Sequence, residues 1–179
     1  MSAVAITLEY QVGGQTGEQS VERLAVAFER AGAELANFGK HVFPELTPVL
    51  EAAIERQFDA EGTGPAAGAW AQLSAAYVAW KEGNYPGQPI LVATGALREA
   101  LTNDAGAHAL RDYTDAMYNF GTQGLDYASL HQTGTGRMPA RPPFDFGPEF
   151  ERELLGAAAA GVRTAVREAS DGLLEVAGE

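Results

Sequence analysis

Hydrophobic residues recur along the chain in patterns that predict helices near both ends and a small sheet between them. Residues 3–10 alternate hydrophobic with smaller or polar side chains, which predicts a strand with one buried face. Residues 20–38 and 44–58 instead repeat hydrophobic residues every three or four positions. This spacing predicts two consecutive amphipathic helices, each with one face in a core.

The ends of these two helices are predicted from their capping residues. We expect Ser20 to cap the first helix and Pro44 to lie in the first turn of the second. The helices are predicted to join near residues 39–43, and Gly62 stops the second. Residues 60–69 are rich in Ala, Gly, Thr and Pro, which predicts a loop.

The middle of the chain is predicted to hold short elements. Ser74 is expected to cap a helix over residues 75–82, and another short helix is expected over residues 96–101. Residues 107–120 alternate in polarity, which predicts a β-hairpin that turns at Thr114-Asp115.

The last third of the chain is predicted to be a short helix, an irregular segment and a long helix. We expect Asp126 to cap a helix over residues 127–132, and the Gly- and Pro-rich residues 134–143 to be irregular. Pro148, with acidic residues beside it, opens the final helix. Its stripe of mostly small residues suits close helix packing and comprises Phe150, Leu154, Ala157, Ala158, Val162, Ala165, Val166 and Ala169.

Together these elements predict an α+β fold, in which a small antiparallel sheet packs against two N-terminal amphipathic helices and a C-terminal helix. A chain of 179 residues suits one main core. We therefore expect a single domain over residues 1–179, with a strand and two helices in 1–62, a motif region in 63–146 and the C-terminal helix in 147–179.

Composition narrows the possible functions. The chain has no cysteine, which excludes disulfides and thiolate chemistry. It has 24 acidic and 12 basic residues, and the acidic excess lies in the two ends of the sequence. Because no cluster of Lys and Arg is present, we do not expect sequence-specific nucleic-acid binding. No hydrophobic run approaches the roughly 20 residues that span a bilayer, so no membrane partner is expected.

Candidate catalytic residues are few, and their spacing argues against catalysis. His131 lies near Asp126 and Ser129 in one predicted short helix, where these spacings do not share a face. The acidic residues Glu149, Glu151 and Glu153 are better explained by the dipole of the helix that they open. His41 and His108 are isolated, so neither a metal nor a cofactor is expected.

Two other groups of residues have more than one interpretation. Trp70, Leu73, Tyr77 and Trp80 are interpreted as core residues rather than as a ligand platform. The proline-stiffened residues 138–144 have two interpretations that stay open. They form a docking edge for another chain, or a rigid connector in which Phe144 fills the core.

The order of these landmarks resembles the phage virion morphogenesis (tail-completion) family, which includes the Mu-like phages. The resemblance covers about residues 58–146. It is carried by Phe58, Gly68-x-Trp70-x-x-Leu73-Ser74-x-x-Tyr77-x-x-x-Lys81, Ile90-Leu91-x-x-Thr94-Gly95-x-Leu97, Tyr127-Ala128-x-x-His131-Gln132-x-Gly134 and Pro139-Ala140-Arg141-Pro142. The chain departs from the family pattern at Pro142-Pro143-Phe144, where a single proline usually precedes the Phe.

The resemblance implies a structural virion protein without catalytic residues, located at the head-proximal end of a phage tail and assembled in the host cytoplasm. It implies a homo-oligomer, commonly a ring of six, that completes the tail and contacts the tail tube and the head–tail connector. A tail terminator and a head-side adaptor both fit. We expect core roles for Trp70, Leu73, Tyr77, Leu91, Gly95, Leu97 and Tyr127. The interface candidates are Arg141, Pro142, Phe144, His131 and Gln132.

Two alternatives accompany this interpretation. The acidic excess either lines the lumen of a ring, where it repels DNA that passes without specific binding, or keeps the free subunit soluble. The competing class of protein is a virion-associated or lysis enzyme such as a peptidoglycan hydrolase. That class requires the glutamates near residue 150, or His131, to converge on a cleft.

Overall fold

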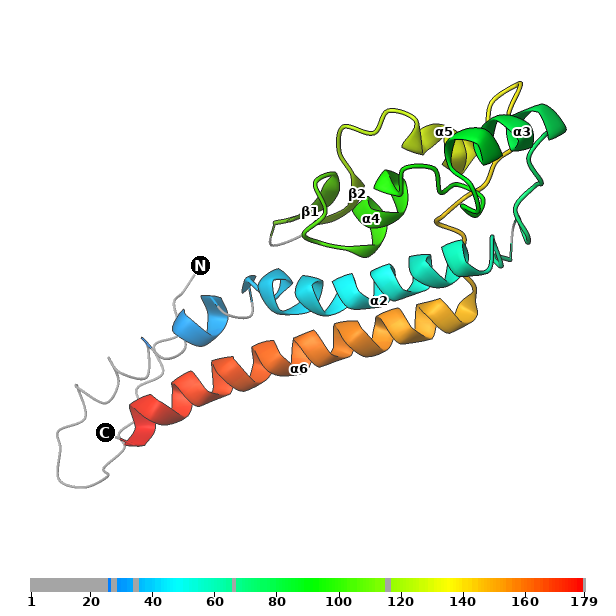
Figure 1. Cartoon of the computed structure of the whole chain (residues 1–179). Helices are drawn as coiled ribbons and strands as arrows, with labels where there is room; N and C mark the ends of the chain where they lie inside the picture. Colours follow the sequence, from blue (N-terminus) through cyan, green and yellow to red (C-terminus); the bar gives the residue numbers. More distant parts are fainter. Residues whose placement is uncertain (1–25, 27–28, 34–35, 66, 115–116, 179) are drawn as a thin grey trace, which may run out of the picture.

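The computed structural model describes residues 26, 29–33, 36–65, 67–114 and 117–178. The fold is α+β, as predicted, and the described residues form an elongated molecule (Figure 1). Its elements are α2 (Gly39–Asp59), α3 (Ala75–Asn84), α4 (Ala96–Thr102), β1 (Ala109–Tyr113), β2 (Tyr118–Thr122), α5 (Ala128–Thr133) and α6 (Pro148–Gly178). The predicted strand over residues 3–10 and the Ser20 cap lie outside the described residues.

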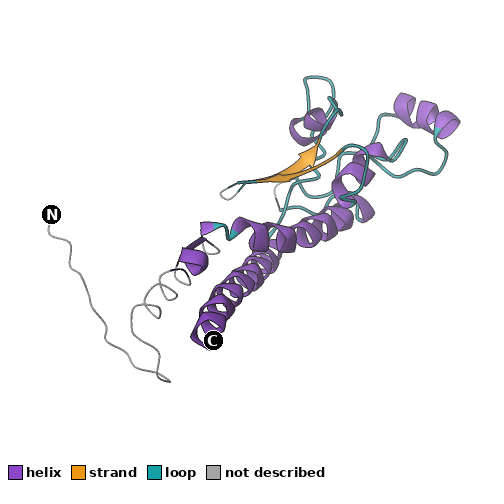
Figure 2. Cartoon of the chain, turned by 90° about the vertical axis from the view of Figure 1, so that its left-hand side faces the viewer, coloured by secondary structure: helices purple, strands orange, loops and turns teal. Residues whose placement is uncertain are grey.

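Helices α2 and α6 run side by side in opposite directions along the length of the molecule (Figures 1 and 2). Their contact uses small residues, as predicted: Ala165 and Ala169 are buried. The helices approach closely at Gly161, where an added Cβ would lie 2.5 Å from the His41 carbonyl oxygen. Two stripe residues differ from the prediction, because Val162 and Val166 are exposed.

The beginning of α2 corrects the predicted join between the two N-terminal helices. Residues 39–43 are helical, and the turn lies earlier, at Asn37 and Phe38. Pro44 is therefore an interior residue of α2 rather than a first-turn residue. A proline removes one backbone hydrogen bond from a helix interior, so contacts along α6 outweigh the local preference of the sequence here.

The predicted hairpin is confirmed, with β2 beginning at Tyr118. The Thr114 N–H donates to the Met117 carbonyl, 2.8 Å away, next to the Tyr113–Tyr118 pair, and residues 115 and 116 of the predicted turn and strand lie outside the described residues. Arg111 pairs with Phe120 across the strands and stacks on its ring, 3.7 Å from the centroid. Arg111 also donates to Glu51 at 2.9 Å, which ties the hairpin to α2.

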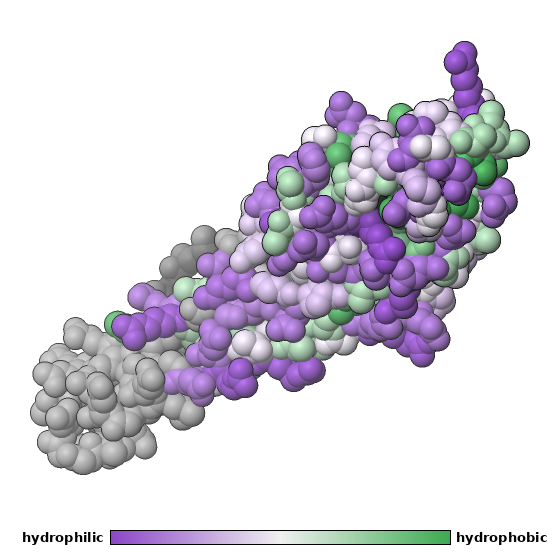
Figure 3. All heavy atoms as spheres, in the orientation of Figure 1, coloured by the Kyte–Doolittle hydropathy of each residue, from purple (hydrophilic) through white to green (hydrophobic). Residues whose placement is uncertain are grey.

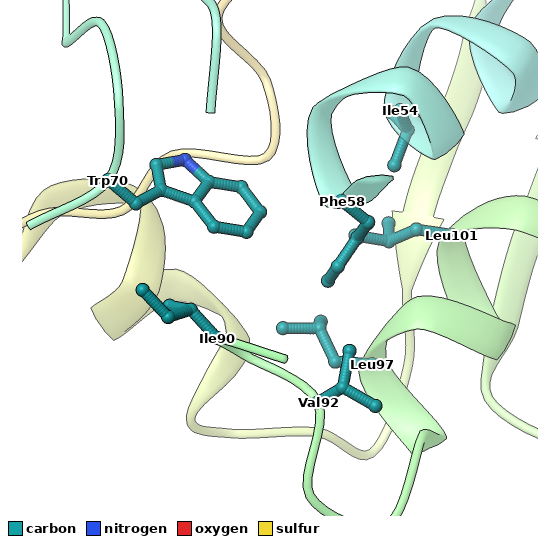
Figure 4. Close-up of a cluster of buried hydrophobic side chains, with 7 residues drawn as sticks. All are labelled: Ile54, Phe58, Trp70, Ile90, Val92, Leu97 and Leu101. Atoms are coloured by element: carbon teal, nitrogen blue, oxygen red, sulfur yellow. The ribbon is translucent and has the colours of Figure 1, made fainter. Parts of the chain in front are cut away.

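The main hydrophobic core lies where α2, α4 and the intervening loops meet (Figure 4). Phe58 and Trp70 are both buried, with their rings edge to face and centroids 5.5 Å apart. The Trp70 indole N–H is satisfied by the Pro142 carbonyl at 3.2 Å. The buried cluster comprises Ile54, Phe58, Trp70, Ile90, Val92, Leu97 and Leu101.

Candidate binding groove

Helix α3 presents an aromatic surface at one end of the molecule. It begins as predicted, because the Ser74 hydroxyl accepts the Tyr77 N–H at 3.3 Å, and it extends two residues further than predicted, to Asn84. Tyr77 and Trp80 are 44% and 49% exposed, with ring centroids 5.2 Å apart. The core interpretation is therefore correct for Trp70 and wrong for these two residues, since α3 projects away from the core (Figure 1).

A groove of about 670 Å³ lies beside α3. Its walls come from α3, the segment before α4, α5 and residues 137–141. Most residues of the family motifs named above meet here, although they are far apart in the sequence. The motif residues that line the groove are Leu73, Ser74, Tyr77, Lys81, Leu91, Thr94, Gly95, Leu97, Tyr127, His131, Pro139 and Arg141.

Two motifs contact each other beneath the groove. The Arg141 N–H donates to the His131 carbonyl at 2.8 Å. The Gln132 side chain accepts from the Phe144 N–H at 3.2 Å and donates to the Phe144 carbonyl at 2.9 Å. Gly134 has a φ of 72°, and an added Cβ would lie 2.7 Å from the Ala140 nitrogen. The α5 motif therefore holds the Pro-Ala-Arg-Pro segment in place, a role that the sequence did not predict.

The interface candidates occupy different positions. Arg141 is only 5% exposed and donates to the carbonyls of Ala71 at 2.7 Å and Gln72 at 3.1 Å. Pro142 is also buried, whereas Phe144 is partly exposed and packs edge to face on Phe120. The contacts of Arg141 and Pro142 lie within the subunit, as in the connector interpretation. An intersubunit role for these residues stays a prediction.

The groove is positively charged. The Lys81 ammonium is buried and donates to the carbonyl of Gln88 at 2.7 Å and to that of Pro89. Burial lowers the pKa of both Lys81 and Arg141. Burial, followed by the charge of Arg141, lowers the pKa of His131. Among the described residues that line the groove, none is a carboxylate.

The groups considered for catalysis are dispersed. Asp126 does not cap α5, because Tyr127 occupies the N-cap without a side-chain bond. Glu149 and Glu151 are exposed in the first turn of α6, and Glu153 pairs with Arg56 of α2 at 2.8 Å.

Two other kinds of feature are absent from the part of the chain that the structure describes. No cluster of three potential metal ligands is present there. No helix there is long and hydrophobic enough to cross a bilayer.

Fold and groove together define an elongated α+β protein with a groove at one end that is lined by cationic and hydrophobic side chains. The chain belongs to the phage virion morphogenesis family, whose sequence profile matches residues 19–163. The match confirms the resemblance drawn from the motifs and extends it into α6. No curated protein and no solved structure gave a significant match. Family membership supports a structural role in phage virion morphogenesis and association with the virion.

Proposed function

We propose that this protein is a structural subunit that completes the tail at its head-proximal end and enables head–tail joining, assembled as a closed ring. The proposal rests on family membership and on one structural observation. Large hydrophobic side chains are exposed at separate places on the subunit, although its core is well packed. Such surfaces on a folded chain are typical of sites that another protein covers.

The first exposed surface lies along α6. Leu155 is 69% exposed, and Val162 and Val166 follow it at seven and eleven residues, so all three lie on one side of the helix. The second is at the α3 end, where Tyr77, Val78 and Trp80 are exposed and hydrophobic residues gather on the surface (Figure 3). Two different surfaces on one subunit permit a head-to-tail contact, which closes into a ring when the rotation between subunits is right.

The enzyme alternative has no supporting observation among the described residues. Its candidate carboxylates Glu149 and Glu151 are at the exposed start of α6, and His131 lines a groove without a carboxylate. General acid–base catalysis needs these groups within hydrogen-bond reach of one substrate. We therefore favour assembly. In the ring, we propose that acidic side chains face the channel and repel passing DNA.

The experiment is to measure the mass of the purified full chain by sedimentation and to view it by electron microscopy, alone and with tail tubes. We expect rings, or subunits that bind tube ends. Leu155→Asp places a charge on the exposed α6 surface and should abolish ring formation. Arg167→Ser makes the same change in net charge at an exposed residue off that surface and should assemble normally. A chain that stays monomeric and binds no tail would refute the proposal.

The same images show whether acidic side chains face the channel of the ring. A neutral or basic channel would refute the proposed repulsion of DNA while leaving the ring in place.

A further inference from the structure

The lining of the groove carries three cationic side chains and, among the described residues, no carboxylate; Glu61 and Glu82 act on the charge of Lys81 from outside the lining. Lys81 and Arg141 are buried, and the hydrogen bonds of both go to backbone carbonyls rather than to carboxylates. Arg137 is exposed at the rim. The Nδ1 atom of His131, another lining residue, is buried and has no hydrogen-bond partner among the described residues. A buried polar atom without a partner is costly.

The walls of the groove set the rest of the ligand's chemistry. Leu73, Leu91 and Leu97 contribute hydrophobic surface, and Tyr77 and Tyr127 add aromatic surface. Its volume of about 670 Å³ is within the usual range of ligand pockets. The groove therefore suits a segment that combines hydrophobic residues with carboxylates.

The chain itself contains such a segment. The last nine residues, 171–179, include three acidic and no basic residues, together with Leu173, Leu174 and Val176. In this region α6 continues to Gly178. Every copy of the chain carries this acidic segment.

The geometry excludes contact between this segment and the groove of the same subunit. Helix α6 has 31 residues and begins seven residues after Arg141, a residue of the groove. At about 1.5 Å per residue, its end lies on the order of 46 Å from its beginning. Figure 1 shows the C-terminal end of α6 and the α3 end at opposite extremes of the molecule. A contact between the two must join different subunits.

We propose that the groove binds the acidic C-terminal end of α6, residues 171–179, of a second copy of this chain. The proposal rests on the ring proposed above and names its contact: the end of one subunit docks beside α3 of the next. The carboxylates of Asp171 and Glu175 lie near Arg137 and the buried cations, and hydrophobic residues fill the groove. Because the two surfaces differ, the contact is head-to-tail and repeats around the ring.

The test uses two full-length variants, one on each side of the contact. Arg137→Glu reverses a rim charge whose side chain is exposed. Asp171→Lys combined with Glu175→Lys reverses the charge of the segment. We expect each variant alone to associate at least about tenfold more weakly than the unmodified chain, with unchanged circular dichroism.

Mixing the two variants gives the sharper result. The Arg137→Glu chain keeps an intact segment and the double variant keeps an intact groove, so their contact is restored in the mixture, and the two reversed charges attract each other at the other contact. Native mass spectrometry should then detect dimers or larger oligomers in the mixture that neither variant forms alone. Glu149→Lys with Glu151→Lys makes the same charge change at the other end of α6, and these control chains should form rings.

Failure of this contact is distinguishable from failure of the proposed function. If all variants form rings as well as the unmodified chain does, the contact is wrong and the ring stands. If the unmodified chain forms no ring, a labelled peptide of residues 168–179 is titrated into it. Binding that Arg137→Glu weakens at least tenfold supports the groove contact, and no binding overturns it.

Discussion

The main core and the α2–α6 helix pair are stabilised in opposite ways. Around Phe58 and Trp70, large side chains from several segments fill a core, and buried polar groups such as the Trp70 indole N–H find backbone partners. Along the α2–α6 pair, the buried residues include Gly161, Ala165 and Ala169, which contribute little side-chain surface but let the helices approach closely. The first region is stabilised by large buried side chains, whereas the second requires small residues where the two helices meet.

The largest effect is expected from removing volume at the core. Phe58→Ala deletes a fully buried ring that packs against Trp70, and should lower the free energy of unfolding by about 3–5 kcal/mol. Urea denaturation followed by tryptophan fluorescence measures the change. Arg163→Ala truncates an exposed side chain of α6 that lies off the Leu155, Val162 and Val166 surface, and serves as the control, with a change within about 0.5 kcal/mol. Equal losses in the two variants would contradict this account of the core.

Adding side-chain volume, rather than removing it, should destabilise the α2–α6 helix pair. Gly161→Ala adds a Cβ that would lie 2.5 Å from both the His41 carbonyl oxygen and the Val42 Cα, so one helix must shift. Overpacking of this kind costs about 1–3 kcal/mol.

Gly156 provides a matched control on the same helix, because an added Cβ there meets no atom within 4 Å. Gly156→Ala should stabilise the protein by about 0.5–1 kcal/mol, since alanine favours the helix. Thermal unfolding of both variants should therefore shift in opposite directions. A rise in melting temperature for Gly161→Ala would show that the helices do not approach this closely.

The same contrast explains which parts of the fold were predictable from the sequence. Periodicity and capping residues located α4, the hairpin and the starts of α3 and α6, because these depend on local signals. The predicted start of α2 was wrong because contacts with α6 keep Pro44 inside the helix. The sequence contains no signal for the role of Gly161, since only the position of α2 reveals why a side chain is excluded there.

The candidate site was predictable only in part. The motifs identified the family and most of the residues that meet at the groove. Their order in the sequence did not indicate that Gln132 holds Phe144, or that Arg141 is buried against backbone carbonyls. Tyr77 and Trp80 have the composition of a core and were interpreted so. Their exposure follows from the direction in which α3 leaves Ser74, for which the sequence contains no signal.

The smallest effect concerns pH and belongs to the groove end alone. Burial and the nearby Arg141 charge lower the pKa of His131 in the folded chain, whereas unfolding restores it to about 6.5. The unfolded state therefore binds a proton more readily, so stability contributed by neutral His131 is present above pH 6.5 and is lost as the pH falls below it. His131→Gln removes this contribution while His41 and His108 remain. The decrease in unfolding free energy between pH 7.5 and 5.5 should thus be smaller in the variant than in the unmodified chain. Equal decreases would mean that His131 is as easily protonated in the fold as in the unfolded chain, and that the groove is less sheltered from water than its geometry indicates.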